Sequence, residues 1–186
     1  LVYNAYTCAD GEHNPVATLL LARAEGTVKH LFSRSGTQDP SQLVLCLVTY
    51  FALACGMPSL PVPMGSFVPS MLIGALSGRL YGEVISLFAT SAGLSVTLGH
   101  PGVYSLVGSA AMLGGFTHMS LAIVALLVEA SHDLTLVPVL MLGVSISTLI
   151  SKRINHHDYD EVLIMKKGVP FLGAEVPHEM EHHGST

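Results

Sequence analysis

Residues 58–69 read PSLPVPMGSFVP, and they are the part of the sequence best suited to hold an anion. The prolines keep residues 58–65 out of regular helix, because proline lacks an N–H and restricts the residue before it. A helix is predicted to begin at about Ser66, so the N–H groups of Ser66, Phe67 and Val68 have no acceptor within it. These donors, together with the positive end of the helix dipole, suit an anion. Arg79 lies about three turns further along the helix, so no full cation is near in sequence. Partial charges alone would hold the anion weakly enough for it to be released.

The same segment has a plainer interpretation. Residues 58–69 could simply connect two apolar helices, with Ser66 capping the second helix and Phe67 packing against neighbours or lipid. On spacing alone, this connector is the preferred interpretation.

A second candidate, Tyr159, lies in the polar stretch HHDYDEV. Its phenol is neutral at pH 7 and can donate one hydrogen bond, which makes it a suitable anion ligand without permanent charge. Tyrosine is also common where a helix meets the membrane surface, and the residues around Tyr159 by themselves favour that interpretation.

Four apolar segments must position these groups: residues 41–57, 67–88, 102–130 and 134–150. The third carries Gly114, Gly115 and Thr117 near its middle and predicts two short helices that meet inside the membrane. Residues 16–32 mix charges with apolar residues and predict an amphipathic helix, lying against other helices or at the membrane interface.

The helix predicted for 67–88 carries Gly74, Gly78 and Gly82 at four-residue spacing. Such a ridge lets another helix approach closely. Short segments broken at Gly or Pro are typical of transporters with discontinuous helices.

Charge is nearly absent from the middle of the chain. Half of the residues are apolar, 11% are charged, and the mean hydropathy is +0.56. Between Asp39 and Lys152 the only Asp, Glu, Lys or Arg are Arg79, Glu83, Glu129 and Asp133. This charge distribution excludes a soluble helical enzyme and indicates a membrane protein. The Lys and Arg residues form no dense patch, which excludes nucleic-acid binding.

Other polar residues have structural interpretations. Glu129 lies in an apolar helix, where an ionisable group is a functional candidate, but a structural role as a cap or in a pair is preferred. Asp133 is expected to cap the next segment. Cys46 and Cys55 are expected to be small buried residues rather than a disulfide pair, whereas Cys8 lies in a polar segment, where an unpaired thiol and a bridge to sequence beyond this chain both stay open.

No signature of catalysis or cofactor binding is present. The sequence holds no nucleophile motif and no Gly-rich phosphate loop, so we do not expect an enzyme. The histidines of residues 177–184 have no regular ligand spacing and predict a solvated linker rather than a metal site.

Four segments together resemble the CLC family of chloride channels and chloride/proton exchangers. GSFVPSMLIGALSGRLYG (65–82) fits the family's G-x-F-x-P motif and following helix, and residues 102–130 are similar to its glycine-containing helix pair. YDEVLIMKKGVPFL resembles its last membrane helix and exit, and residues 13–32 resemble its N-x-x-A-T-L…LF pattern. The matches follow one order over nearly the whole chain, so it resembles the carboxy-terminal half of a eukaryotic-type CLC membrane domain.

The resemblance implies an all-α fold of tilted, discontinuous and re-entrant helices, part of the second inverted repeat. Residues 1–40 would form the amphipathic helix and loop, and 41–153 the transmembrane helices with the anion-binding loop. Residues 154–171 would form the last membrane helix and exit, and 172–186 a linker toward a cytosolic domain outside this chain. Such domains can bind nucleotides, but this chain is expected to hold no cofactor.

For the site, the resemblance implies a central chloride ion held by the backbone amides of Ser66 and Phe67 and by the Tyr159 hydroxyl. The remaining residues of the motif, which shape the start of the helix, are Gly65, Val68 and Pro69. The family's gating glutamate has no counterpart here, and because the chain begins at Leu1 without a methionine, we expect further sequence upstream.

The resemblance also implies a homodimer through membrane helices around residues 102–130, where Gly108, Gly114 and Gly115 would allow close packing. Basic residues after the last long span place the carboxy terminus in the cytosol. The protein is thus expected to be a multi-pass membrane protein in contact with lipid, at the cell surface or in an organelle.

Two functions follow. The first is voltage- or proton-coupled transport of chloride or a similar anion, as part of a larger protein, with channel and exchanger both open. The second is a non-transporting membrane fragment whose role is assembly.

Overall fold

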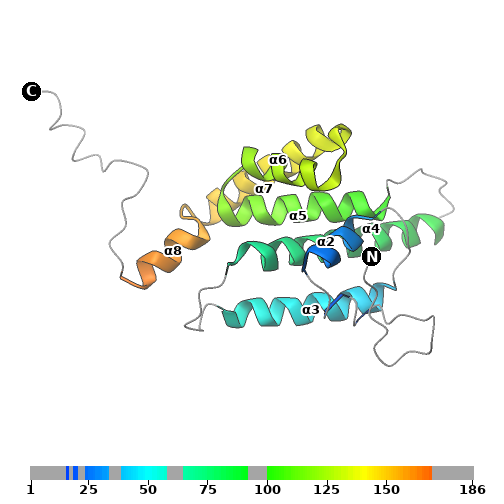
Figure 1. Ribbon diagram of the computed structural model, residues 1–186, viewed down its shortest axis with the longest axis horizontal. Helices are drawn as coiled ribbons and strands as arrows, with labels where there is room; N and C mark the ends of the chain where they lie inside the picture. The colour runs from blue at the N-terminus through cyan, green and yellow to red at the C-terminus, as the bar shows by residue number, and fades with distance from the viewer. Residues whose placement is uncertain are drawn as a thin grey trace, which may run out of the picture.

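The computed structural model describes residues 16, 19–20, 24–33, 39–57, 65–91 and 100–168. Every regular element in these ranges is a helix (Figure 1). The helices are α2 (Ala24–Phe32), α3 (Pro40–Gly56), α4 (Phe67–Ser91), α5 (Pro101–Thr117), α6 (Leu121–Ser131), the short 3₁₀ turn η2 (Leu134–Leu136), α7 (Val137–Ile154) and α8 (Tyr159–Lys166). The all-α prediction is confirmed for this part of the chain.

Several predictions concern residues outside the described ranges. These are the proline-rich residues 58–64, Cys8, most of the opening segment, the exit after Gly168, and the linker with its histidines.

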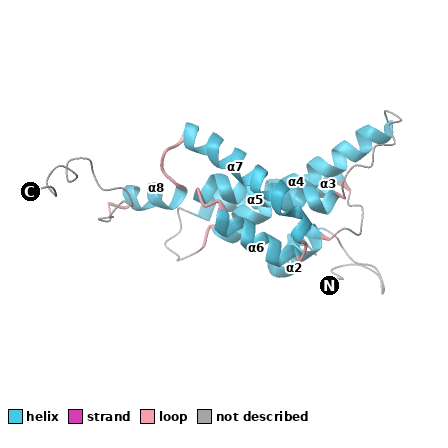
Figure 2. Ribbon diagram, turned by 90° about the horizontal axis from the view of Figure 1, so that it is seen from above, coloured by secondary structure: helices cyan, strands magenta, loops and turns pink. Residues whose placement is uncertain are grey.

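The helices pack as a row with α4 and α5 at its centre. α3 lies against α4 on one side and α7 against α5 on the other, while α2 contacts both central helices (Figure 1). α6 contacts α5 and α7. α8 lies at one end of this bundle, as a view turned by 90° also shows (Figure 2).

Glycines bring α4 and α5 into backbone contact. A Cβ on Gly74 would lie 2.6 Å from the Gly108 carbonyl oxygen, and one on Gly78 would collide with the Tyr104 carbonyl oxygen. Gly74 therefore faces Gly108 while Gly78 faces Tyr104, so the two helices run antiparallel. The close approach predicted from the glycine ridge is confirmed.

Hydroxyl groups add hydrogen bonds where the backbones are close. Ser105 on α5 donates to the Ala75 carbonyl oxygen of α4 at 2.8 Å. On α7, Ser147 donates to Ala111 and Ser151 to Gly115, both at 2.6 Å. Each bond satisfies a hydroxyl that would otherwise be costly to bury, as is common between membrane helices.

The other glycines of α5 also pack inside this chain. A Cβ on Gly114 would lie 2.9 Å from Val144, and one on Gly115 would lie 2.8 Å from the Ser147 hydroxyl, so both face α7. Gly108 faces α4. The prediction that these glycines form close contacts at a dimer surface is wrong, because the chain's own helices occupy that space.

The two predicted short helices are present, and their joint is a left-handed cap. α5 ends at Thr117, and His118 follows with φ 54°, its N–H donating to the Gly114 carbonyl oxygen. α6 then begins at Leu121. The break therefore falls just after the glycines that the sequence suggested, because Gly114 and Gly115 are needed inside α5 to contact α7.

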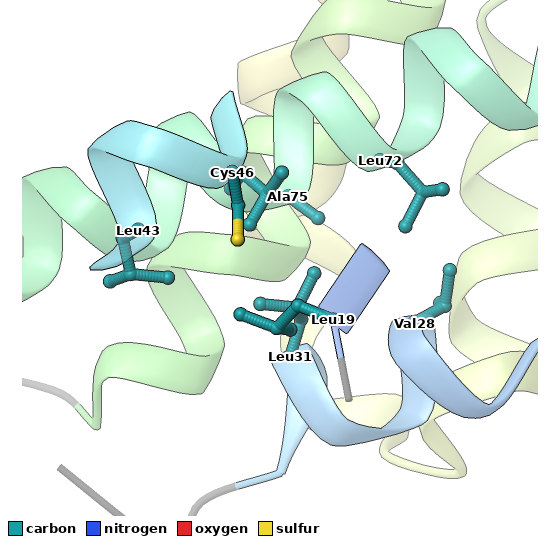
Figure 3. Close-up of a cluster of buried hydrophobic side chains, with 8 residues drawn as sticks. Leu19, Val28, Leu31, Leu43, Cys46, Leu72 and Ala75 are labelled. Atoms are coloured by element: carbon teal, nitrogen blue, oxygen red, sulfur yellow. The ribbon is translucent and has the colours of Figure 1, made fainter. Parts of the chain in front are cut away.

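Two apolar clusters hold the row together. The first joins α2, α3 and α4 through buried side chains that include Leu31, Leu43 and Leu72 (Figure 3). Cys46 is fully buried in it, as predicted. The second joins α5, α6 and α7 around Leu113, Leu127 and Val144. Cys55 is exposed instead of buried, so that part of the cysteine prediction is wrong.

Arg79 carries a buried positive charge within α4. Its side chain is 1% exposed, and its Nη1 donates to the carbonyl oxygens of His30 (3.3 Å), Leu31 (2.6 Å) and Ser33 (3.2 Å). These carbonyls lie at and just beyond the carboxyl end of α2, where the helix dipole is negative. Glu83, one turn later, is 5% exposed, and its negative charge compensates the buried cation.

The outer surface is apolar along the long helices. Leu53 on α3 is 61% exposed, and Leu142 and Leu149 on α7 are 64% and 66% exposed. Two stretches, Phe67–Ala89 and Leu134–Lys166, are long and apolar enough to cross a membrane. Shorter apolar helices, Pro40–Gly56 and Leu121–Ser131, accompany them.

Replacing Gly78 with alanine should lower the thermal stability of the full-length protein in detergent. The new methyl group would push α5 away at Tyr104, and overpacking of this kind costs about 1–3 kcal/mol. Gly26→Ala in α2 is the matched control, because nothing lies within 4 Å of its Cβ position. Equal melting temperatures for the two variants would contradict the role given to Gly78.

Candidate functional site

A cavity of about 370 Å³ lies where four helices approach one another. α3 contributes its last turns, α4 its first turns, α5 its carboxyl end and α8 one face. The lining residues are Phe51, Ala54, Cys55, Met57, Gly65, Ser66, Pro69, Ser70, Ile73, Met112, Phe116, Tyr159, Asp160, Leu163 and Lys167.

The structure places most of the predicted site residues at this cavity. Gly65, Ser66, Pro69 and Tyr159 line it. The Phe67 side chain does not; it packs against the cluster that joins α5, α6 and α7. Val68 does not line the cavity either, and it is 40% exposed. Residues that are about 90 positions apart in sequence thus meet at one site, which sequence spacing alone could not indicate.

The first turn of α4 presents backbone donors. The helix begins at Phe67, and the Ser66 carbonyl oxygen accepts from the Ser70 N–H at 3.2 Å. Pro69 has no N–H. For the amides of Ser66, Phe67 and Val68, no acceptor lies within hydrogen-bond distance in the described part of the chain. With respect to the described residues, the donors inferred from the sequence are therefore unpaired at the start of α4.

The plainer interpretation of this segment holds in part. Phe67 is a packing residue, as that interpretation proposed. Ser66, however, makes no capping hydrogen bond to any residue that the structure describes; Ser70 instead turns its hydroxyl to the Phe67 carbonyl oxygen at 2.8 Å.

Tyr159 begins α8, and the preceding residue fixes that start. Asp158 caps the helix, its Oδ1 accepting from the Glu161 N–H at 2.8 Å. His157 Nδ1 lies 3.1 Å from Glu161 Oε2. Among the residues described, no partner occupies the Tyr159 hydroxyl, so it can donate to a ligand.

Phe116 packs directly on Tyr159. Their ring centroids are 4.3 Å apart, with the planes inclined by 30°. Phe116 belongs to α5, and Met112 lies one turn earlier on the same face of the cavity. The sequence analysis did not single out either residue, although their four-residue spacing within an apolar helix places them on a common face.

The charges around the cavity are few and of both signs. Asp160 and Lys167, both from or next to α8, are the charged members of the lining. The α4 side supplies only neutral donors, because the Arg79 guanidinium is engaged with α2. On the α4 side, an anion would therefore meet partial charges instead of a fixed cation, and Lys167 is the cation on the α8 side.

The other candidate residues lie away from this site. Glu129 is exposed on α6. Asp133 caps η2 as predicted, its Oδ1 accepting from the Thr135 N–H at 3.1 Å and from its hydroxyl at 2.6 Å. His118 Nε2 lies 3.1 Å from the Ser151 hydroxyl. Within the described ranges no cluster of His, Cys, Asp and Glu could hold a metal ion.

Comparison with known proteins gives a consistent picture. Residues 13–152 match the family described as voltage gated chloride channel, a range that ends before α8. Mouse H(+)/Cl(-) exchange transporter 7 is 37% identical over 171 residues, which are 91% of this chain and 21% of that protein. Dictyostelium discoideum chloride channel protein C is 33% identical over 93% of this chain and 22% of its own length. Arabidopsis thaliana chloride channel protein CLC-d is 30% identical over 95% and 22%. The chain spans about a fifth of the length of these relatives.

Phe67→Pro should weaken anion binding by removing one amide donor. Proline is tolerated at the first helical position, so α4 should still form. Losing a hydrogen bond to a charge costs about 1.5–3 kcal/mol, or roughly tenfold or more in Kd. Chloride titration calorimetry on the full-length protein would measure this.

Phe67→Leu is the matched control, because it removes the ring but keeps the amide. We expect it to bind chloride much more tightly than Phe67→Pro. Equal affinities for the two variants would show that the side chain, and not the amide, is important at this position.

Proposed function

Because this chain belongs to the family of voltage-gated chloride channels, we propose that it moves chloride or a similar anion across a membrane as part of a longer protein. Relatives named as exchangers and as channels support this function. The family consists of integral membrane proteins, and the apolar outer faces of α3 and α7 agree with contact to lipid.

One observation carries the proposal: the start of α4 and the first residue of α8 share one cavity. Ser66 and Tyr159 both line it, and each side supplies neutral donors that have no partner among the described residues. In our proposal the amides of Ser66 and Phe67 and the Tyr159 hydroxyl bind a chloride ion. They would replace part of its hydration shell.

The neutral character of these donors suits transport. A chloride ion next to a buried Lys or Arg would be held by a full charge in a low-dielectric site, which is strong and slow to release. Partial charges bind more weakly and allow the ion to leave. Arg79 does not interfere, because its guanidinium contacts the carboxyl end of α2.

Orientation and assembly are further parts of the proposal. Lys152 and Arg153 lie in the last turn of α7 and are exposed, which supports a cytosolic position for that end. The exposed apolar side chains on α6 and α7, among them Leu121 and Leu149, support a homodimer through membrane helices, even though the glycines of α5 are engaged within the chain.

A non-transporting role in assembly is the alternative. Its support is the exposed apolar side chains on α3 and α7, such as Leu53, Leu142 and Leu149. It predicts that the apolar faces bind other subunits and that the cavity binds no anion.

Reconstituted liposomes test the proposed function. The full-length protein should release chloride from loaded vesicles, with proton movement recorded at the same time. Chloride flux that drives protons uphill identifies an exchanger, and flux without protons identifies a channel. No flux of any anion would reject transport and favour the assembly role.

Tyr159→Phe should weaken chloride binding by removing the hydroxyl while keeping the ring. We expect a loss of about 1.5–3 kcal/mol, the contribution of a hydrogen bond to a charge, measured by titration calorimetry. Tyr81→Phe is the control, since Tyr81 lies on α4 away from the cavity and is 61% exposed. Unchanged affinity in Tyr159→Phe would remove this tyrosine from the site.

A further inference from the structure

The α8 helix, which carries Tyr159, is weakly held by the rest of the bundle. It has eight residues, and none of them is buried. Helices of this length are marginal on their own and depend on tertiary contacts. A donor on such a helix needs a further contact to keep its hydroxyl at one place.

The Phe116 ring provides that contact. It lies flat against the Tyr159 ring, with centroids 4.3 Å apart and an inclination of 30°. Both rings line the cavity that also contains Ser66. Stacking restricts the tilt of the phenol, and the position of its hydroxyl depends on that tilt.

Phe116 itself is firmly anchored. The preceding residue, Gly115, is in close contact with α7, where its carbonyl oxygen accepts from the Ser151 hydroxyl at 2.6 Å. The following residue, Thr117, donates from its hydroxyl to the Leu113 carbonyl oxygen at 2.9 Å. His118, which ends the helix, lies 3.1 Å from the same Ser151 hydroxyl. The residues before and after Phe116 are thus held by hydrogen bonds.

The geometry points to Phe116 as the positioning residue for the chloride-binding hydroxyl of Tyr159. It transfers the fixed geometry of α5 to the donor on α8, a helix with no buried residue, and it acts through Tyr159 and not by touching the ion. This inference rests on the proposed function. It adds a requirement for an aromatic ring at position 116. Neither the G-x-F-x-P motif nor the list of cavity-lining residues by itself implies that requirement.

A double-mutant cycle on the full-length protein tests this role. Chloride affinity is measured by titration calorimetry for the original protein, Phe116→Leu, Tyr159→Phe and the double variant. Phe116→Leu should bind chloride roughly three- to tenfold more weakly, the range expected for loss of an aromatic pair. In the Tyr159→Phe background the same change should have no further effect, because the hydroxyl that it positions is absent.

Two variants separate positioning from general packing. Phe116→Tyr keeps a ring and should restore nearly the original affinity. Phe88→Leu makes the same chemical change at a 75% exposed position of α4 and should leave affinity unaltered. Thermal melts of every variant show whether the bundle remains folded.

The outcomes distinguish this inference from the proposed function. If the original protein binds chloride but Phe116→Leu binds it equally well, or if the two losses simply add, the positioning role is overturned while the proposed function stands. Failure of Phe116→Tyr to restore affinity would also overturn it. Absence of chloride binding by the original protein would overturn both.

Discussion

The arrangement of this protein depends on backbone contact between α4 and α5. Gly74, Gly78 and Gly108 remove the side chains that would separate the two helices, and carbonyl oxygens of one helix lie where a Cβ of the other would be. Antiparallel pairing at this distance fixes the register. It therefore brings the first turn of α4 and the last turn of α5 to the same end of the bundle, where the cavity forms.

The start and the middle of α4 differ in their chemistry for a physical reason. At its start, neutral amides face the cavity, and the cation in the cavity lining, Lys167, comes from the end of α8 and not from α4. At about 18 Å further along the helix, Arg79 and Glu83 are buried, and the Arg79 charge is bound by the carbonyl oxygens at the end of α2. A buried cation needs such partners. Binding it to α2 keeps its charge away from the anion donors while it fastens α2 to the central pair.

The candidate site joins parts of unequal rigidity. The amides of α4 belong to a long helix packed on three others, whereas Tyr159 lies on a helix without a buried residue. Segments with few buried contacts open with low free energy. A site of this kind can hold an ion between a fixed side and an adjustable side, and the Phe116 ring is the contact that couples them.

The sequence by itself determined the class of the protein, the helix start at Ser66 and Phe67, the glycine ridge and the break before Met119. These follow from local rules, because proline, glycine spacing and the absence of charge act within one or two turns. Only the tertiary structure decided that Phe116 stacks on Tyr159, that Cys55 faces the cavity and that Arg79 binds α2. That Tyr159 and Ser66 line one cavity was implied by the family resemblance but not by their spacing in the sequence. The tertiary structure also decided that Gly108, Gly114 and Gly115 pack within the chain. These contacts join residues far apart in sequence. Packing between helices decides which face of each helix meets which neighbour. A single sequence of apolar segments does not indicate how the helices are aligned against one another.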